Sequence, residues 1–206
     1  MKKIKILYLS FFEENDIILS KKYNTTIINI FSNDFKLNII ENTYHLLILG
    51  GGIKGIPRAS NLIDYQPDIF NLLNNIKIPV LGICYGMELL YNFIYNKIPK
   101  ELQERHKRDN VNIKLDSRYN ITSNITNMNV RFNHKYYCPD VSKGIISKLK
   151  IIDTNKNNKN NKLEIPIFIK FKKNIYGTQF HFKNKKDLTE IIDNIINNHL
   201  YQSYNL

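Results

Sequence analysis

The chain of 206 residues contains no tryptophan and only two cysteines, Cys84 and Cys138. Two cysteines are too few for the disulfide framework of a small secreted domain, so we expect both to be free thiols. There is no Cys-x-x-Cys pair and the five histidines are dispersed, so the sequence predicts no metal and no cofactor. No apolar run reaches the roughly 18 residues of a membrane-spanning helix, so no membrane association is expected.

The chain is also short of acidic residues, with 18 Asp and Glu against 30 Lys and Arg and a net charge of +12. The basic residues are scattered, without a continuous Lys/Arg run or a nucleic-acid-binding module. Codon bias toward A and T would enrich Lys, Asn, Ile, Tyr and Phe in the same way. We therefore expect no nucleic-acid partner.

Length and composition are those of a globular protein with a sizeable core, at 43% hydrophobic and 23% charged residues. Lys5 interrupts the short apolar stretch near the N-terminus, which favours a first strand over a signal peptide. We expect a single domain over residues 1–206 and, by default, a cytoplasmic location.

In the first half, apolar segments typical of buried strands alternate with segments of helical periodicity. The predicted strands are Lys5–Leu9, Thr25–Phe31, Leu46–Leu49 and Ile78–Ile83. The predicted helices are Glu13–Lys22, Asp34–Asn42, Tyr65–Ile76 and Met87–Tyr95. This alternation predicts an α/β fold, a doubly wound and mostly parallel sheet with helices on both faces.

The second half is different, because its strands follow one another with little helix between them. The predicted strands are Val111–Leu115, Met128–Phe132, Leu149–Asp153, Ile165–Phe171 and Ile175–Phe180. A polar tract over Asn155–Lys162 is predicted to be a loop, and Leu188–Leu200 a closing amphipathic helix. An additional antiparallel region is therefore expected here.

The strand at Ile78–Ile83 runs directly into a helix through Gly82-Ile-Cys84-Tyr-Gly86. This pattern is typical of a nucleophile elbow, a strained turn that lifts one side chain above the sheet. A cysteine there lies at a helix N-terminus, where the helix dipole favours the reactive thiolate. The N–H of Tyr85 would face a developing oxyanion. Taken alone, the pattern fits a buried structural cysteine equally well.

Two further elements supply groups that such a cysteine would need. Gly50-Gly-Gly52 follows a strand, and its backbone N–H groups suit an oxyanion hole better than a phosphate site, since no P-loop ending follows. His181 lies at the end of a late strand in Gln179-Phe-His-Phe182, where a general base is expected.

These motifs together resemble the class I glutamine amidotransferases. That family has Gly-Gly-Pro, Gly-x-Cys-x-Gly-x-Gln and Gln-Phe-His-Pro-Glu, in the same order along the chain. The family's Ser-His-x-Asp-x-Val region is similar to Asn133-His134 followed by Asp140-Val141. The resemblance covers the whole chain and implies a flavodoxin-like fold. In length, the chain is most similar to the separate amidase subunit of two-chain GMP synthetases.

The resemblance implies that Cys84 and His181 are catalytic and that the N–H groups of Gly52 and Tyr85 form the oxyanion hole. It also implies that Gly51, Glu88 and His134 bind substrate. The expected reaction is hydrolysis of the glutamine amide through a thioester, which gives glutamate and ammonia for a synthetase partner.

Two positions depart from the family's pattern. Lys183 occupies the place of the triad glutamate, which leaves a Cys–His dyad unless a carboxylate such as Asp187 replaces it. Glu88 occupies the place of a glutamine, as in the related γ-glutamyl hydrolases. A γ-glutamyl hydrolase and a catalytically impaired pseudoenzyme therefore stay open as alternatives.

Overall fold

The computed structural model describes residues 3–11, 19–30, 44–52, 62–154 and 160–204. One sheet has seven strands in the order β2-β1-β3-β4-β9-β8-β7. Their bounds are Asn24–Asn29, Lys5–Phe11, Leu46–Gly52, Val80–Ile83, Ile175–Thr178, Asn160–Lys172 and Ile145–Thr154 in that order. The first five strands are parallel, and β8 pairs antiparallel with both β9 and β7, so the sheet is mostly parallel with an antiparallel region in the second half, as the sequence predicted.

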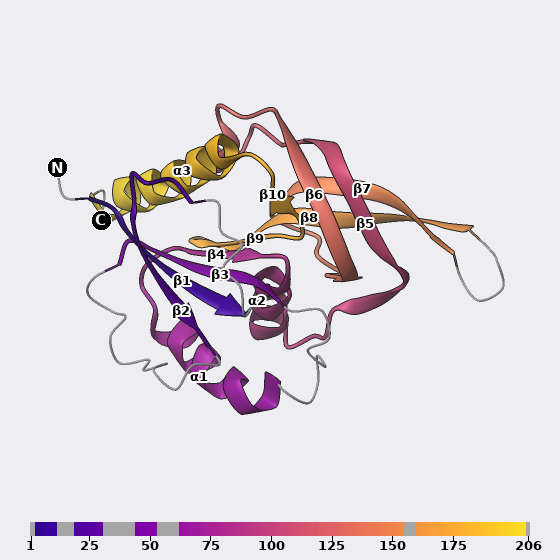
Figure 1. Ribbon diagram of the computed structural model, residues 1–206, viewed down its shortest axis with the longest axis horizontal. Helices are drawn as coiled ribbons and strands as arrows, with labels where there is room; N and C mark the ends of the chain where they lie inside the picture. The colour runs from indigo at the N-terminus through magenta and orange to yellow at the C-terminus, as the bar shows by residue number, and fades with distance from the viewer. Residues whose placement is uncertain (1–2, 12–18, 31–43, 53–61, 155–159, 205–206) are drawn as a thin grey trace.

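A second, antiparallel sheet has three strands in the order β10-β6-β5. Their bounds are His181–Phe182, Asn127–Tyr137 and Lys100–Lys114. In Figure 1 the long strands β5 and β6 rise beside the main sheet, where the parallel strands β1, β3 and β4 end. The second sheet therefore stands over the edge at which α/β folds usually place their functional groups.

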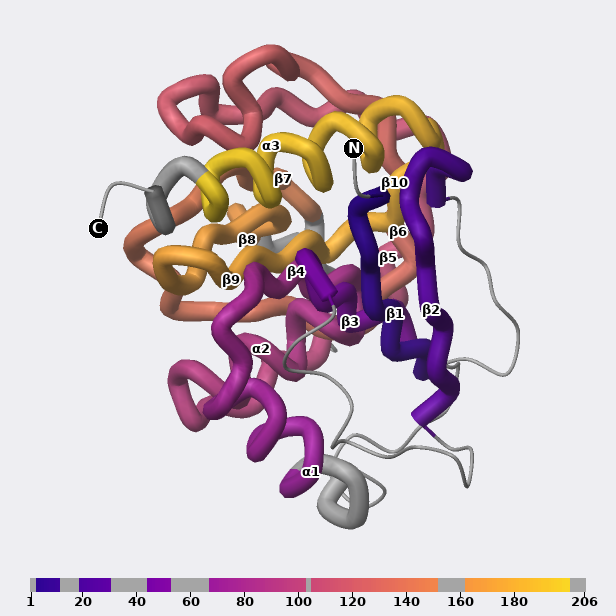
Figure 2. The backbone as a smooth tube through the Cα atoms, turned by 90° about the vertical axis from the view of Figure 1, so that its left-hand side faces the viewer, coloured from indigo at the N-terminus to yellow at the C-terminus, as the bar shows by residue number. Residues whose placement is uncertain are grey.

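Helices cover both faces of the main sheet (Figures 1 and 2). α1 (Leu62–Asn75) and α2 (Tyr85–Tyr95) lie on one face, and α3 (Lys185–Tyr204) lies on the other. A short 3-10 helix, η2 (Asn120–Thr122), packs against α3. None of the helices in the described part of the chain is long and apolar enough to cross a membrane.

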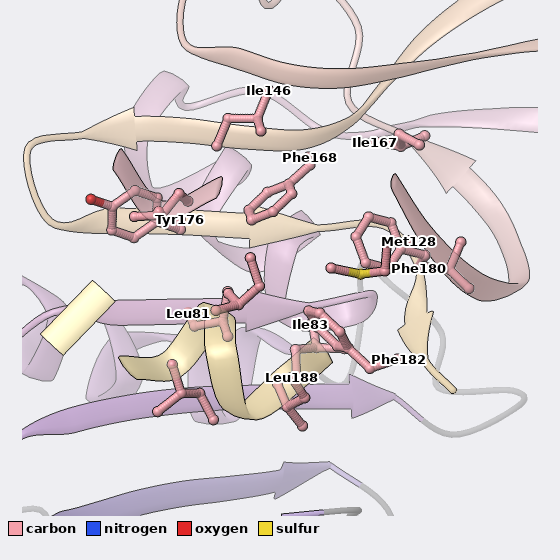
Figure 3. Packing of buried hydrophobic residues seen from close by; sticks show 14 of the residues in the cluster. Leu81, Ile83, Met128, Ile146, Ile167, Phe168, Tyr176, Phe180, Phe182 and Leu188 are labelled. Atoms are coloured by element: carbon pink, nitrogen blue, oxygen red, sulfur yellow. The ribbon is translucent and has the colours of Figure 1, made fainter. Parts of the chain in front are cut away.

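The burial pattern explains these layers. β3 and β4 are almost entirely buried, because helices cover the sheet on both sides. β6 alternates exposed and buried residues from Asn127 to His134, because only one of its faces meets the core. The core under α3 gathers side chains from both sheets, including Ile83, Met128, Phe168, Phe180 and Phe182 (Figure 3).

Several strand boundaries differ from the sequence predictions, and two of the differences affect the second sheet. β5 is 15 residues long, whereas the apolar pattern marked only Val111–Leu115, because Lys100–Asn110 is too polar to resemble a buried strand. The strand predicted over Ile175–Phe180 stops at Thr178, and the chain then joins the second sheet at His181.

Some predicted segments fall beyond the described residues. The helix predicted at Asp34–Asn42 lies outside them. Of the helix predicted at Glu13–Lys22, only residues 19–22 are described, and they are not helical. Within the loop predicted at Asn155–Lys162, the described residues from Asn160 onward already belong to β8.

Candidate active site

Cys84 lies between β4 and α2 in a backbone conformation that non-glycine residues rarely adopt. Its φ is 54° and its ψ is −105°, and it is the N-cap residue of α2. Such a conformation costs about 1–3 kcal/mol and persists only where the surrounding structure enforces it. The backbone N–H of Cys84 donates to the carbonyl oxygen of Thr178 over 2.6 Å, which ties the turn to the end of β9.

The glycines on either side of Cys84 allow this turn. A Cβ atom on Gly86 would lie 2.1 Å from the carbonyl oxygen of Leu49 in β3. A Cβ atom on Gly82 would lie 2.5 Å from the backbone of Gly86. The first turn of α2 can therefore lie directly on the sheet only because both positions lack a side chain.

The end of β3 reaches the same turn. Gly51 is buried, and a Cβ atom on Gly52 would lie 2.7 Å from Cγ of Tyr85. The Tyr85 ring is itself held edge-on against Phe11, with ring centroids 5.1 Å apart. The two residues predicted to supply oxyanion-hole N–H groups, Gly52 and Tyr85, are therefore neighbours beside Cys84.

His181 is brought to this edge of the sheet by two buried aromatic neighbours. Phe180 is fully buried, with its ring centroid 5.3 Å from Phe182 and 5.9 Å from Phe168. His181 lies between these two aromatic residues in the chain and is less buried than either of them. It is half-buried and stands opposite Arg131 in the β10–β6 register.

Glu88 lies in the first turn of α2 and is 3% exposed. One of its carboxylate oxygens accepts a hydrogen bond from the side-chain amide of Gln179, over 3.1 Å. Gln179 is fully buried and precedes His181 by two residues. The sequence predicts residue 88 as a substrate contact, and the structure adds a bond from Glu88 to Gln179 within the protein.

Lys183, in the place of the family's triad glutamate, has an identifiable partner. Its exposed side chain donates to the side-chain oxygen of Asn110 on β5. Asp187, considered as a replacement carboxylate, lies half-buried in the first turn of α3. Burial raises the pKa of its carboxyl, and the neighbouring Lys186 opposes this rise.

His134 is buried on the inner face of β6, where it forms a pair with His106 of β5. Its Nε2 lies 3.1 Å from Nδ1 of His106, and its Nδ1 lies 2.7 Å from the carbonyl oxygen of Tyr136. Both ring nitrogens are thus engaged within the protein. A contact between His134 and substrate would have to use its backbone.

This histidine pair gives a prediction about pH and stability. Burial and the nearby Arg108 lower the pKa of His106. As the pH falls through about 6.5, the unfolded chain takes up a proton that the folded protein resists, so the free energy of unfolding falls. Above that pH His106 is neutral in both states and adds no pH dependence.

We therefore expect the Tm to fall as the pH is lowered from about 7.5 to 5.5, and His106→Gln to reduce the slope of Tm against pH. Thermal unfolding followed by circular dichroism at several pH values measures this slope. The slope should not vanish, because burial and Lys173 also lower the pKa of His199. An unchanged slope in His106→Gln would contradict a buried neutral imidazole at that position.

Cys138 belongs to a different environment from Cys84. It is fully buried among Met87, Tyr91, Val141 and Ile169. This cluster is apolar and lies apart from the elbow, whereas the ring nitrogens of His134 are engaged by His106 and the carbonyl oxygen of Tyr136. Within the described residues, no group of three or more His, Cys, Asp or Glu side chains is placed to hold a metal ion.

Comparison with known proteins identifies the family. The sequence profile of the family Glutamine amidotransferase class-I matches residues 15–197. The chain belongs to the class I glutamine amidotransferases. Among curated relatives of this amidotransferase, the glutamine-hydrolysing GMP synthase of Petrotoga mobilis is 28% identical over 179 residues, which cover 86% of this chain and 32% of that protein.

The corresponding enzyme of Ehrlichia canis is 27% identical over 160 residues, which cover 74% of this chain and 28% of that protein. The amidotransferase chain thus spans about a third of the length of these curated relatives.

Solved structures agree on the fold. A putative GMP synthase subunit from Thermoplasma acidophilum superposes with a TM-score of 0.72 at 15% identity, covering 99% of this chain and 98% of that one. The glutaminase domain of CTPS from Trypanosoma brucei, solved with bound acivicin, gives a TM-score of 0.59 at 9% identity, with coverages of 96% and 94%. At these identities the likeness supports the flavodoxin-like amidotransferase fold alone.

Two residues of the site were not assigned a role from the sequence. Gln179 stood in the motif around His181, but its bond to Glu88 joins positions 91 residues apart and leaves no local signal. His106 lies in a polar stretch that did not resemble a strand. Only the pairing of β5 with β6 places it beside His134.

Proposed function

We propose that this amidotransferase hydrolyses the side-chain amide of glutamine, with Cys84 as nucleophile and His181 as the acid–base group. The observation that carries the proposal is the strained backbone of Cys84 at the N-terminus of α2. Strain of this kind accumulates at functional sites, and the helix N-terminus favours a thiolate over a thiol. A cysteine that only filled the core would not need the strain.

In the first step the Cys84 thiolate attacks the amide carbon of glutamine, and the N–H groups of Gly52 and Tyr85 hydrogen-bond the resulting oxyanion. The tetrahedral intermediate collapses when His181 protonates the leaving nitrogen. Ammonia departs and a γ-glutamyl thioester remains on Cys84. His181 then takes a proton from water, which attacks the thioester and releases glutamate and the thiolate.

We further propose that the ammonia is used by a synthetase partner, as the names of the GMP synthase relatives suggest. Those relatives are about three times as long as this chain, so the synthetase would be a separate chain or segment. We assign the activity to the cytoplasm by default, and assign substrate contacts to Gly51 and the β6 backbone at His134.

A glutaminase assay tests this proposal. Purified protein is incubated with glutamine, alone and beside a GMP synthetase subunit from the same organism, and ammonia and glutamate are measured. Equal amounts of both products support the proposal. The absence of both under each condition would contradict it. If γ-glutamyl peptides are not hydrolysed either, the pseudoenzyme alternative is left.

The second candidate is a γ-glutamyl hydrolase. It is favoured by Glu88 and by the sequence Phe132-Asn-His-Lys-Tyr136, which resembles the Asn-Phe-His-Lys-Trp stretch of the γ-glutamyl hydrolases. A carboxylate at position 88 would attract an amine and repel a carboxylate, which would alter the choice of substrate. This alternative predicts that γ-glutamyl peptides are hydrolysed faster than free glutamine. The opposite order would favour the glutaminase.

The departure at position 183 gives a further prediction. We expect Lys183→Glu to raise kcat for glutamine about tenfold or more, because a carboxylate beside His181 orients the ring and stabilises its cation. Steady-state ammonia release measures this effect. Lys183→Met is the control, since it removes the ammonium and its bond to Asn110 without adding a carboxylate.

If Lys183→Met raises kcat as much as Lys183→Glu, the gain comes from losing the cation and not from an orienting carboxylate. If neither variant changes kcat, position 183 does not act on His181, and the Cys84–His181 dyad operates without a third member.

A further inference from the structure

The buried bond between Glu88 and Gln179 joins the two segments that carry the proposed catalytic groups. Glu88 lies one helical turn after Cys84, and its backbone N–H donates to the carbonyl oxygen of Cys84 over 3.3 Å. Gln179 directly follows β9 and lies two residues before His181. The side-chain amide of Gln179 donates to Glu88 Oε1 over 3.1 Å.

Both side chains are out of contact with solvent, at 3% and 0% exposure for Glu88 and Gln179. Buried polar groups are held in place when they are hydrogen-bonded, and a carboxylate makes a stronger acceptor than a neutral group. Glu88 also lies in the first turn of α2, close to Cys84 in the chain. The bond between the two side chains therefore lies in the interior and not at the surface.

The segment that leads from β9 to His181 is also anchored elsewhere. Gln179 N–H donates to the carbonyl oxygen of Ile167 over 2.8 Å, and Thr178 Oγ1 donates to the carbonyl oxygen of Phe180 over 3.2 Å. These bonds fix the segment to β8 and to itself. The Glu88–Gln179 bond adds a direct side-chain link from this segment to the helix that follows Cys84.

We propose that Glu88 is a positioning residue, whose Oε1 atom holds Gln179 and thereby sets His181 relative to Cys84. This inference rests on the proposed roles of Cys84 and His181, but it does not require glutamine to be the substrate. The position needs only an acceptor oxygen at the reach of a Glu or Gln side chain. The family's usual glutamine and this chain's glutamate both offer one.

The test compares Glu88→Met with Glu88→Gln. Both replacements remove the carboxyl group and keep the side-chain length, but only glutamine can still accept the bond from Gln179. We expect Glu88→Met to lower kcat about 100-fold with KM changed less than about threefold, because small displacements of catalytic groups cost rates of this order. Glu88→Gln should recover at least about a tenth of the wild-type kcat.

A second readout does not depend on the substrate. The ring of His181 is titrated by NMR in the wild-type protein and in both variants. We expect its apparent pKa and chemical shifts to move in Glu88→Met and to stay near the wild-type values in Glu88→Gln. If glutamine is not hydrolysed but this difference is found, the proposed function fails and the positioning role stands.

The double variant Glu88→Met/Gln179→Met guards against misfolding, since it replaces both buried polar groups with apolar ones of similar size. It should lose no more activity than Glu88→Met alone, because both remove the same bond. Equal behaviour of Glu88→Met and Glu88→Gln in both readouts would overturn the proposal. A higher KM in Glu88→Met with kcat and the His181 titration unchanged would also overturn it, and would make Glu88 a substrate contact.

Discussion

Cys84→Ala is expected to lower ammonia release from glutamine by at least about 10⁴-fold, because removing a nucleophile leaves only the residual catalysis of binding and the oxyanion hole. The variant should remain folded, since Cys84 is 8% exposed at a turn and alanine fits the same space. Ammonia release is measured with wild-type and variant protein at equal concentration.

Cys138→Ala is the matched control, because Cys138 is a second buried cysteine that packs among Met87 and Tyr91 away from the elbow. It should retain the wild-type rate per folded molecule. Retained activity in Cys84→Ala would contradict the assignment of the nucleophile. A loss of ammonia release in Cys138→Ala without a loss of folded protein would indicate that Cys138, and not Cys84, is the nucleophile.

Gly86→Ala is expected to be the most destabilising single-methyl change in the elbow. Its new Cβ would lie 2.1 Å from the backbone carbonyl oxygen of Leu49, which cannot move without displacing β3. We expect a loss of about 3 kcal/mol or more in the free energy of unfolding. For a chain of this size, that corresponds to a fall of about 6–12 °C in Tm.

Gly177→Ala is the matched control on the neighbouring strand β9. Its Cβ would lie 2.8 Å from Cγ of Met87 and from the edge of the Phe171 ring, which are side-chain atoms that can move. Its Tm should fall by less than half as much. Similar Tm values for Gly86→Ala and the wild-type protein would show that α2 does not lie as close to β3 as the structure places it.

The parallel part of the fold could be predicted from the sequence because its strands are short, apolar and separated by helices. Val80–Ile83 and Leu46–Leu49 are buried on both faces, and a strand buried in this way consists of nearly consecutive apolar residues, which the sequence shows directly. β5 could not be predicted in full. Its residues from Lys100 to Asn110 form a ladder with β6 while one face stays in water, so polar residues are tolerated there.

The elbow turn could be predicted because a local pattern encodes it. A Cβ atom on Gly82 or Gly86 would overlap the neighbouring backbone, and Cys84 adopts a positive φ between them. The partners of Lys183 and Glu88 had no such pattern. Lys183 reaches Asn110 across 73 positions of sequence, and Gln179 reaches Glu88 across 91. Contacts of this kind depend on how the two sheets pack, which single-sequence periodicity does not specify.

The two departures from the family's pattern now have different meanings. Lys183 has an exposed partner on β5, so its ammonium does not lie in the core. Glu88 is buried and bonded to Gln179. We propose that the first departure lowers the rate of the proposed reaction and that the second keeps the geometry on which that reaction depends.

We propose that the thiol of Cys84 is the reactive nucleophile of a glutamine site. Covalent labelling with acivicin, the compound bound to the structurally similar CTPS glutaminase domain of Trypanosoma brucei, tests this claim. Labelled protein is digested and the modified peptide is identified by mass spectrometry, with and without excess glutamine. We predict one label per chain, on Cys84, formed more slowly when glutamine is present. Labelling of Cys138, or none at all on a folded protein, would contradict the claim.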